Sequence, residues 1–137
     1  MNRWADWRNQ AARDLAHARH ALDDGDYEWA AFAAQQAAEK VLKALIMANG
    51  GEPWGYLTAG LVDALPEPPE GADVQDAARR LDKHHIPARY PNGFAASYPG
   101  RLYTRGEVDQ AIADAALITE FCGSRLPRQA PPDRGGA

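Results

Sequence analysis

The alanine-rich stretch from Tyr27 to Ala48 constrains the fold of this chain more than any other feature. A helix built from it would be apolar over much of its circumference and would have to lie among other helices. Its small side chains would let those neighbours approach closely. The pattern therefore predicts a central helix over residues 27–48. Its main apolar stripe consists of Ala30, Ala33, Ala34, Ala37, Val41, Ala44, Leu45 and Ala48.

A narrow polar strip remains on this predicted helix, formed by Gln35, Gln36, Glu39, Lys40 and Lys43. Gln36, Lys40 and Lys43 share one face, and Glu39 and Lys43 have the spacing and order of a favourable helical ion pair. Two interpretations are open. Periodicity alone favours a solvated strip that keeps a mostly buried helix soluble, and the alternative is that the strip carries part of a functional site.

Four further helices are predicted around the central one, each from an apolar face bounded by turn or capping residues. Gly25 and Asp26 form the turn between the first two helices, with Asp26 as a candidate N-cap. Pro87 ends the helix that follows the leucine-rich one, and Thr104 with Glu107 forms a capping box at the start of the last. The predicted ranges are 2–22, 57–65, 73–85 and 104–122.

A proline-rich segment separates the last two helices. Prolines at 87, 91 and 99 and glycines at 93 and 100 make residues 86–103 irregular by every local signal, and long structured loops are disproportionately functional. We predict an all-α fold, an up-and-down bundle of four to five helices with a Pro-rich irregular loop before the last helix. Residues 1–126 form this bundle, and residues 127–137 have the composition of a disordered tail.

The charge distribution points to a local anion site. The formal charge of the chain is −4, yet six basic residues and one acidic residue lie between Arg79 and Arg105. An acidic scaffold that holds one basic segment is typical of a protein with a local anion site rather than one coated in positive charge for duplex DNA. The residues expected to line this anion site are Lys83, His84, Arg89, Tyr90, Asn92 and Arg101, with Gln36 and Lys40 from the central helix.

The remaining polar motifs predict no metal and no cofactor. His17 and His20 are spaced as metal ligands on a helix, but nothing nearby completes a coordination set. The single cysteine, Cys122, is expected to be a small core residue. Every apolar run is too short to span a membrane, and together with the single cysteine this predicts a cytoplasmic protein.

Large aromatic side chains exceed what the predicted core needs. Trp4, Trp7, Trp29 and Phe32 belong to helices whose core stripes are already filled by alanine, valine and leucine. At least some of them are therefore expected at a subunit interface, and we predict a homodimer.

Two motifs are specific as a pair: the Gln-Ala-Ala-Glu-Lys of the alanine-rich helix and the later Ile-Pro-x-Arg-Tyr-Pro. They belong to the first two of three stretches, DLAHARHALDDGDYEWAAFAAQQAAEKVLKALIMANG (14–50), ARRLDKHHIPARYPNGF (78–94) and YTRGEVDQAIADAALITEF (103–121). Together these stretches resemble the HEPN domain family over roughly residues 4–126. The resemblance implies a helical bundle that pairs into a homodimer, with the Arg-Tyr-Pro loop near a groove for nucleotides or RNA. It also implies a possible nucleotidyltransferase partner protein in a toxin–antitoxin-like module.

Many members of that family are metal-independent ribonucleases with a histidine four to six residues after an arginine. No histidine follows Arg89 at that distance, and Tyr56 and Leu57 stand where relatives of this branch often have His-Ser. Weak catalytic candidates remain in His85 and Arg89. Three functions are therefore weighed: a nucleotide- or RNA-binding partner of a nucleotidyltransferase, a non-catalytic dimerisation module, and, least favoured, a ribonuclease.

Two roles for Arg89 stay open. It binds an anion, or it is structural, bonding to loop carbonyls or pairing with Glu39 on the central helix. For His85 the structural alternative is a helix-end residue packed on Tyr90.

Overall fold

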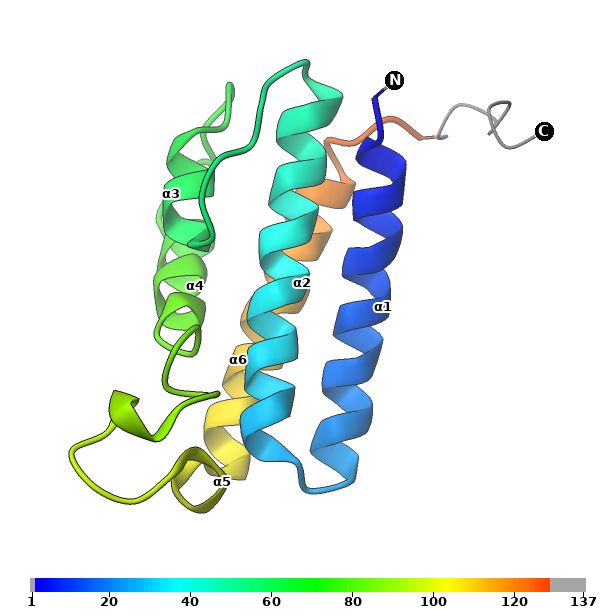
Figure 1. Cartoon of the computed structure of the whole chain (residues 1–137). Helices are drawn as coiled ribbons and strands as arrows, with labels where there is room; N and C mark the ends of the chain where they lie inside the picture. The colour runs from blue at the N-terminus through cyan, green and yellow to red at the C-terminus, as the bar shows by residue number, and fades with distance from the viewer. Residues whose placement is uncertain (1, 129–137) are drawn as a thin grey trace.

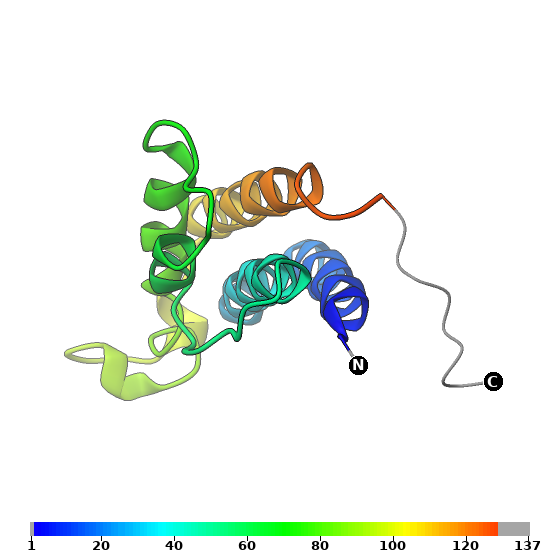
Figure 2. The ribbon, with the colours of Figure 1, turned by 90° about the horizontal axis from the view of Figure 1, so that it is seen from above.

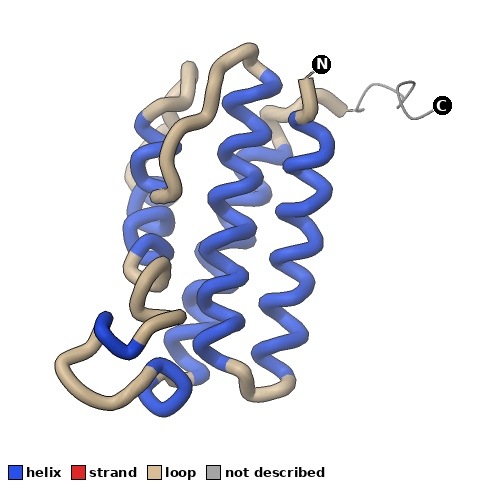
Figure 3. Tube along the Cα trace, in the orientation of Figure 1, coloured by secondary structure: helices blue, strands red, loops and turns tan. Residues whose placement is uncertain are grey.

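The computed structural model describes residues 2–128, and within that range the chain forms helices and loops and no strand (Figure 3). The all-α prediction is confirmed. The helices are α1 (Trp4–Asp23), α2 (Tyr27–Ala48), α3 (Thr58–Asp63), α4 (Asp73–Asp82), α5 (Pro99–Leu102) and α6 (Arg105–Gly123), with a 3-10 turn at Pro91–Gly93. The predicted tail lies outside the described residues, except for its first two positions.

Helix α2 is the centre of the molecule, as its sequence predicts. It packs antiparallel to α1 and also contacts α3, α4, α5 and α6 (Figure 1). Viewed from above, α1 and α2 lie side by side, with α6 along them and α3 and α4 to one side (Figure 2). Six alanines of α2 have no exposed surface at all, so no larger side chain would fit there without moving a neighbour. They are Ala30, Ala31, Ala34, Ala37, Ala38 and Ala44.

Local signals set two of the helix boundaries. Gly25 has a φ of +80° in the turn after α1, a conformation that favours glycine. Asp26 stands at the N-cap position of α2, but its side chain makes no capping hydrogen bond. At α6 the predicted capping box is confirmed, since Thr104 Oγ1 accepts from the Glu107 N–H at 3.3 Å and the Glu107 carboxylate accepts from the Thr104 N–H at 3.2 Å.

Helix α4 ends at Asp82, three residues before the predicted end at His85. The Asp82 carboxylate accepts hydrogen bonds from the Thr58 N–H at 2.7 Å and the Ala59 N–H at 2.9 Å, which caps the start of α3. Beyond Asp82 the chain tightens into successive turns that continue to Arg89. Pro87 contributes to this, because a proline disfavours helical backbone at the residue before it.

The solvated interpretation of the polar strip is wrong for three of its members. Gln35 is 0% exposed, Glu39 4% and Lys43 9%. The loop after α2 folds back over them: Gln35 Nε2 donates to the Tyr56 carbonyl at 3.0 Å, and Lys43 Nζ lies 5.3 Å from the centre of the Tyr56 ring. The predicted Glu39–Lys43 ion pair is confirmed at 3.1 Å.

The segment 86–103 is less irregular than predicted, because it contains the 3-10 turn and α5. Pro99 occupies the first turn of α5, where its missing N–H costs no hydrogen bond. Gly100 lies so close to α2 that a Cβ there would stand 2.5 Å from Glu28 Oε2. The loop is therefore fixed against the start of the central helix.

The four aromatic residues proposed for an interface differ in how far they are exposed. Trp4 is 5% exposed and belongs to the core, whereas Trp29 is 53% exposed. Trp7 and Phe32 are half-buried. Leu57, expected on the apolar face of the third helix, precedes α3 and is 50% exposed.

The expected core position of Cys122 is confirmed. Cys122 is buried in the core, and burial raises the pKa of its thiol to about 12. Among residues 2–128 no group of three or more His, Cys, Asp or Glu side chains is arranged to hold a metal ion. None of the described helices is long and apolar enough to cross a membrane.

Candidate functional site

An open groove lies where α2, the loop after it and the turns after α4 meet. It has a volume of about 350 Å³ and is lined by Phe32, Gln36, Tyr56, His85 and Arg89. Helix α2 contributes Phe32 and Gln36 one turn apart, so both side chains emerge on the same face. We refer to this hollow as the Arg89 groove.

The Arg89 guanidinium is held by one carbonyl and two aromatic rings. Its Nε donates to the His85 carbonyl at 3.0 Å, and its central carbon lies 4.5 Å from the Phe32 ring centre and 5.1 Å from that of Tyr90. Such stacking suits a planar guanidinium. Its terminal Nη groups donate to no described residue, so those hydrogens remain available.

Arg89 has no carboxylate partner within residues 2–128. The salt bridges there join Arg3 to Asp6, Lys40 to Asp14, Lys43 to Glu39 and Arg80 to Asp114. The suggested Arg89–Glu39 pair is therefore wrong, because the Glu39 carboxylate is taken by Lys43 from the next turn of its own helix. The other structural alternative, hydrogen bonds from Arg89 to loop carbonyls, is confirmed for one carbonyl, that of His85.

His85 lines the groove together with Arg89. The sequence predicts it at the end of a helix, but α4 ends at Asp82, so His85 lies in the turns after that helix. Its ring stacks on Tyr56, with centres 6.2 Å apart and planes 17° apart, and also approaches Phe32 at 6.4 Å. It packs on these residues rather than on Tyr90. Its Nδ1 atom is buried without a hydrogen-bond partner among the described residues.

His84, the neighbouring residue, does not line the groove. Its Nδ1 lies 2.7 Å from the Tyr103 hydroxyl. Burial lowers the pKa of His84, and burial raises the pKa of Tyr103 far above its ordinary value. The tyrosine hydroxyl therefore stays protonated and donates a hydrogen bond to Nδ1 of a neutral imidazole. This histidine joins the end of α4 to the start of α6.

The other proposed binding residues take different positions. Lys83, Asn92 and Arg101 are exposed and are not among the residues that line the groove. Tyr90 flanks it through its contact with the Arg89 guanidinium. Lys40 forms an ion pair with Asp14 of α1. Of the eight residues expected to bind, the structure brings together Gln36, Arg89 and Tyr90.

A second hollow continues the groove along α1 and α2. It measures about 280 Å³ and shares Phe32 and Gln36 with the Arg89 groove. Gln36 therefore stands between the two hollows. The other lining residues of the second hollow are Asp14, His17, Trp29, Ala33 and Lys40.

Sequence reasoning missed Phe32 and Tyr56 as groove residues. Phe32 is expected from the sequence only at a subunit interface, and Tyr56 only as the replacement of a histidine. The available signal is weak. Trp54 and Tyr56 are aromatic residues in a Pro- and Gly-containing loop directly after the central helix, and both are strongly exposed, at 80% and 69%.

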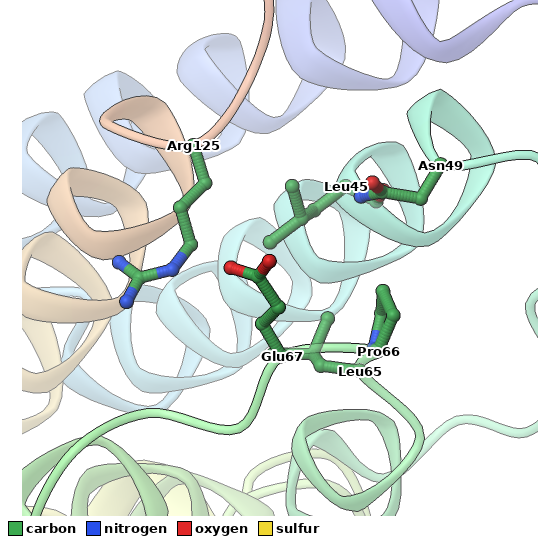
Figure 4. Close-up of a pocket in the computed structure, with 6 residues that line it drawn as sticks. All are labelled: Leu45, Asn49, Leu65, Pro66, Glu67 and Arg125. Carbon is green, nitrogen blue, oxygen red and sulfur yellow. The ribbon is translucent and has the colours of Figure 1, made fainter.

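A further hollow, of about 330 Å³, lies at the other end of α2 near Asn49 (Figure 4). The Glu67 and Arg125 side chains point toward one another across it. A carboxylate that faces the only guanidinium of the hollow offsets its attraction for an anion. The Arg89 groove, which has no such carboxylate among its lining residues, is the better anion site.

Comparison with known proteins agrees with the helical arrangement and the resemblance seen in the sequence. The family model described as "HEPN domain" matches residues 4–126. This chain belongs to the HEPN family. No curated protein matches it.

Solved structures of other HEPN-like proteins superimpose on most of this HEPN chain. TT1696 from Thermus thermophilus is 45% identical, with a TM-score of 0.87, over 92% of this chain and 100% of its own. ST0689, an archaeal HEPN homologue, is 38% identical, with a TM-score of 0.80, over 93% and 100%. An HEPN domain protein from Thermotoga maritima (tm0613) is 34% identical, with a TM-score of 0.69, over 90% and 99%.

The buried His84 predicts a pH-dependent stability of this HEPN protein. Because its pKa is lower in the folded state than in the unfolded state, its stabilising effect is complete above the unfolded value of about 6.5 and is lost as the pH falls below it. His84→Gln removes this titration. We expect the stability difference between parent and variant, measured by urea unfolding, to shrink as the pH falls from about 7.5 to about 5. A difference that stays constant over this range would contradict the neutral, buried state of His84.

Proposed function

We propose that this HEPN protein binds a nucleotide or single-stranded RNA in the Arg89 groove, with a phosphate on the Arg89 guanidinium. One observation carries the proposal. Arg89 lies in an open groove, oriented by the His85 carbonyl and the Phe32 ring, with no carboxylate partner among the described residues. A guanidinium with free Nη hydrogens matches the geometry of phosphate oxygens.

The rest of the groove suits a nucleoside. Three aromatic rings, those of Phe32, Tyr56 and His85, line it, and His85 packs against the other two. Aromatic platforms beside a cation are the usual means of binding single-stranded nucleic acid without strong sequence preference. The excess of basic residues between Arg79 and Arg105 adds a favourable local potential on an otherwise acidic protein.

Binding is favoured over RNA cleavage. Metal-independent cleavage needs one group to take the 2′-hydroxyl proton and another to protonate the leaving oxygen. His85 and Arg89 share the groove, which favours the ribonuclease alternative, but His85 is the only imidazole that lines it, and its Nδ1 is buried. The absence of a histidine after Arg89 points the same way.

We further propose that the protein acts as a homodimer and as the partner of a nucleotidyltransferase in a toxin–antitoxin-like module. Membership of the HEPN family supports both parts. The homodimer is also supported by Trp29, which is half exposed and lies edge-to-face against Phe32 at 6.3 Å. Its neighbour Phe32 reaches the Arg89 groove, so a second copy seated on Trp29 would lie beside the site.

The Arg89 proposal predicts a loss of binding without a loss of folding. Arg89→Ala should weaken affinity for adenosine 5′-monophosphate about tenfold to a hundredfold, as expected for a hydrogen-bonded charge pair. Affinity of the parent should fall as salt rises, because phosphate contacts displace counterions. Arg89→Lys should restore only part of the affinity, since lysine lacks the planar fork. Calorimetric titration at several salt concentrations measures all three effects.

The matched control for that experiment is Arg79→Ala, which removes an exposed arginine of the same basic segment that lines no described hollow. It should bind like the parent. Thermal unfolding separates binding from architecture, because a purely structural Arg89 would lower the melting temperature of Arg89→Ala substantially. A stable Arg89→Ala protein that binds like the parent would refute the proposed site.

The homodimer predicts a measurable effect of Trp29. Sedimentation at micromolar concentration should give twice the monomer mass for the parent, and Trp29→Glu should shift it toward the monomer by placing a charge in an apolar contact. Leu117→Glu, which alters a 38% exposed leucine on α6, is the control and should remain dimeric. A monomeric parent protein would rule out the homodimer.

A further inference from the structure

Two neighbouring glutamines of α2 form a directed hydrogen-bond chain beside the Arg89 groove. The Gln35 side chain is completely buried, and its Nε2 donates to the Tyr56 carbonyl at 3.0 Å. Its Oε1 accepts from Gln36 Nε2 at 2.8 Å. A backbone carbonyl only accepts hydrogen bonds, so the Gln35 side chain must turn its Nε2 toward the Tyr56 carbonyl and its Oε1 toward Gln36. Gln36 must in turn donate from its Nε2 to that Oε1.

These two hydrogen bonds leave the Gln36 side-chain oxygen as a free acceptor. No donor of the described residues bonds to it, and it is not among the buried side-chain atoms that lack a partner. The atom is therefore accessible, and Gln36 lines both the Arg89 groove and the hollow beside it. Its orientation is set in advance by Gln35, which reduces the entropy cost of binding.

No other groove side chain has an acceptor whose direction a side-chain hydrogen bond fixes. The imidazole of His85 can accept, but its ring makes no hydrogen bond to a described residue, and its Nδ1 is buried. Arg89 carries donors only, and Phe32 has no polar atom. Tyr56 is 69% exposed, and its hydroxyl makes no hydrogen bond to a described residue. Gln36 Oε1 is thus the groove acceptor whose direction the protein fixes.

We propose that Gln36 determines which nucleobases bind, by accepting an N–H hydrogen bond from the base edge, and that Gln35 is the residue that positions it. The inference rests on the proposed nucleotide-binding function. It defines the ligand class as nucleotides whose base offers an amino or imino N–H to the groove while the phosphate lies on Arg89. An analogue without that N–H leaves the Gln36 oxygen buried and unpaired, which costs about fivefold to a hundredfold in affinity.

Pairs of nucleotides that differ only at the donor test this directly. Adenosine 5′-monophosphate is compared with its N6,N6-dimethyl derivative, cytidine 5′-monophosphate with its N4,N4-dimethyl derivative, and uridine 5′-monophosphate with its N3-methyl derivative. Affinities are measured by calorimetry for the parent, Gln36→Met and Gln35→Met. Gln110→Met, on α6, is the control for replacing a glutamine elsewhere. Urea unfolding confirms that each variant is folded.

The parent should prefer the unmodified member of at least one pair by about fivefold or more. Gln36→Met should abolish that preference. Because methionine is about as long as glutamine, any steric clash with the methyl groups would remain in this variant, so the loss of the preference reports the lost hydrogen bond. Gln35→Met should reduce the preference while the salt dependence of binding stays unchanged, which a merely structural role would not produce. Gln110→Met should behave like the parent.

Two results would overturn the inference. One is that the parent binds both members of every pair equally, and the other is that the preference survives in Gln36→Met. Either result leaves the proposed function intact, provided that nucleotides bind and that Arg89→Ala weakens the binding as predicted above. If no nucleotide binds to the parent protein at all, the proposed function fails and the inference fails with it.

Discussion

The burial of the alanine face of α2 is the constraint on which the rest of this structure depends. Ala30, Ala34 and Ala37 have no exposed surface, and α2 touches every other α-helix of the described chain. Packing this close leaves the polar residues of α2 with little access to water, so each needs a partner. The loop after α2 supplies one by placing the Tyr56 carbonyl on Gln35. The Arg89 groove is the space left where that loop meets the turns after α4.

The polar groups around the groove are held by neighbours rather than by solvent. Gln36 is oriented through Gln35, and Arg89 through the His85 carbonyl and the Phe32 ring. Lys43 is neutralised by Glu39, so that carboxylate does not compete for Arg89. The result is one oriented guanidinium and one oriented amide oxygen in a groove that aromatic side chains also line. Groups fixed in advance in this way lose little entropy on binding, which is why we assign function to this groove.

The sequence predicts those parts of the molecule that local physics decides. Helix α2 runs over the predicted residues because apolar periodicity is strong there, and α6 begins at its predicted capping box. Partners distant in sequence decide the rest. Helix α4 stops early where Asp82 turns to Thr58 and Ala59, and the strip around Gln35 is buried by a loop whose path no periodicity records. The site is affected most: the basic segment is recognisable, but neighbouring histidines separate, His85 toward Arg89 and His84 toward Tyr103.

The most direct test of the central claim, that the Arg89 groove is where a nucleotide binds, is an NMR titration of the isotope-labelled protein with adenosine 5′-monophosphate. The Arg89 Nε–H, the Gln36 side-chain amide and the Tyr56 ring should shift together and saturate with one affinity. The Arg125 Nε–H, in the hollow at the other end of α2, should stay unchanged. Shifts confined to Arg125 and Asn49, or no shifts at all, would contradict it.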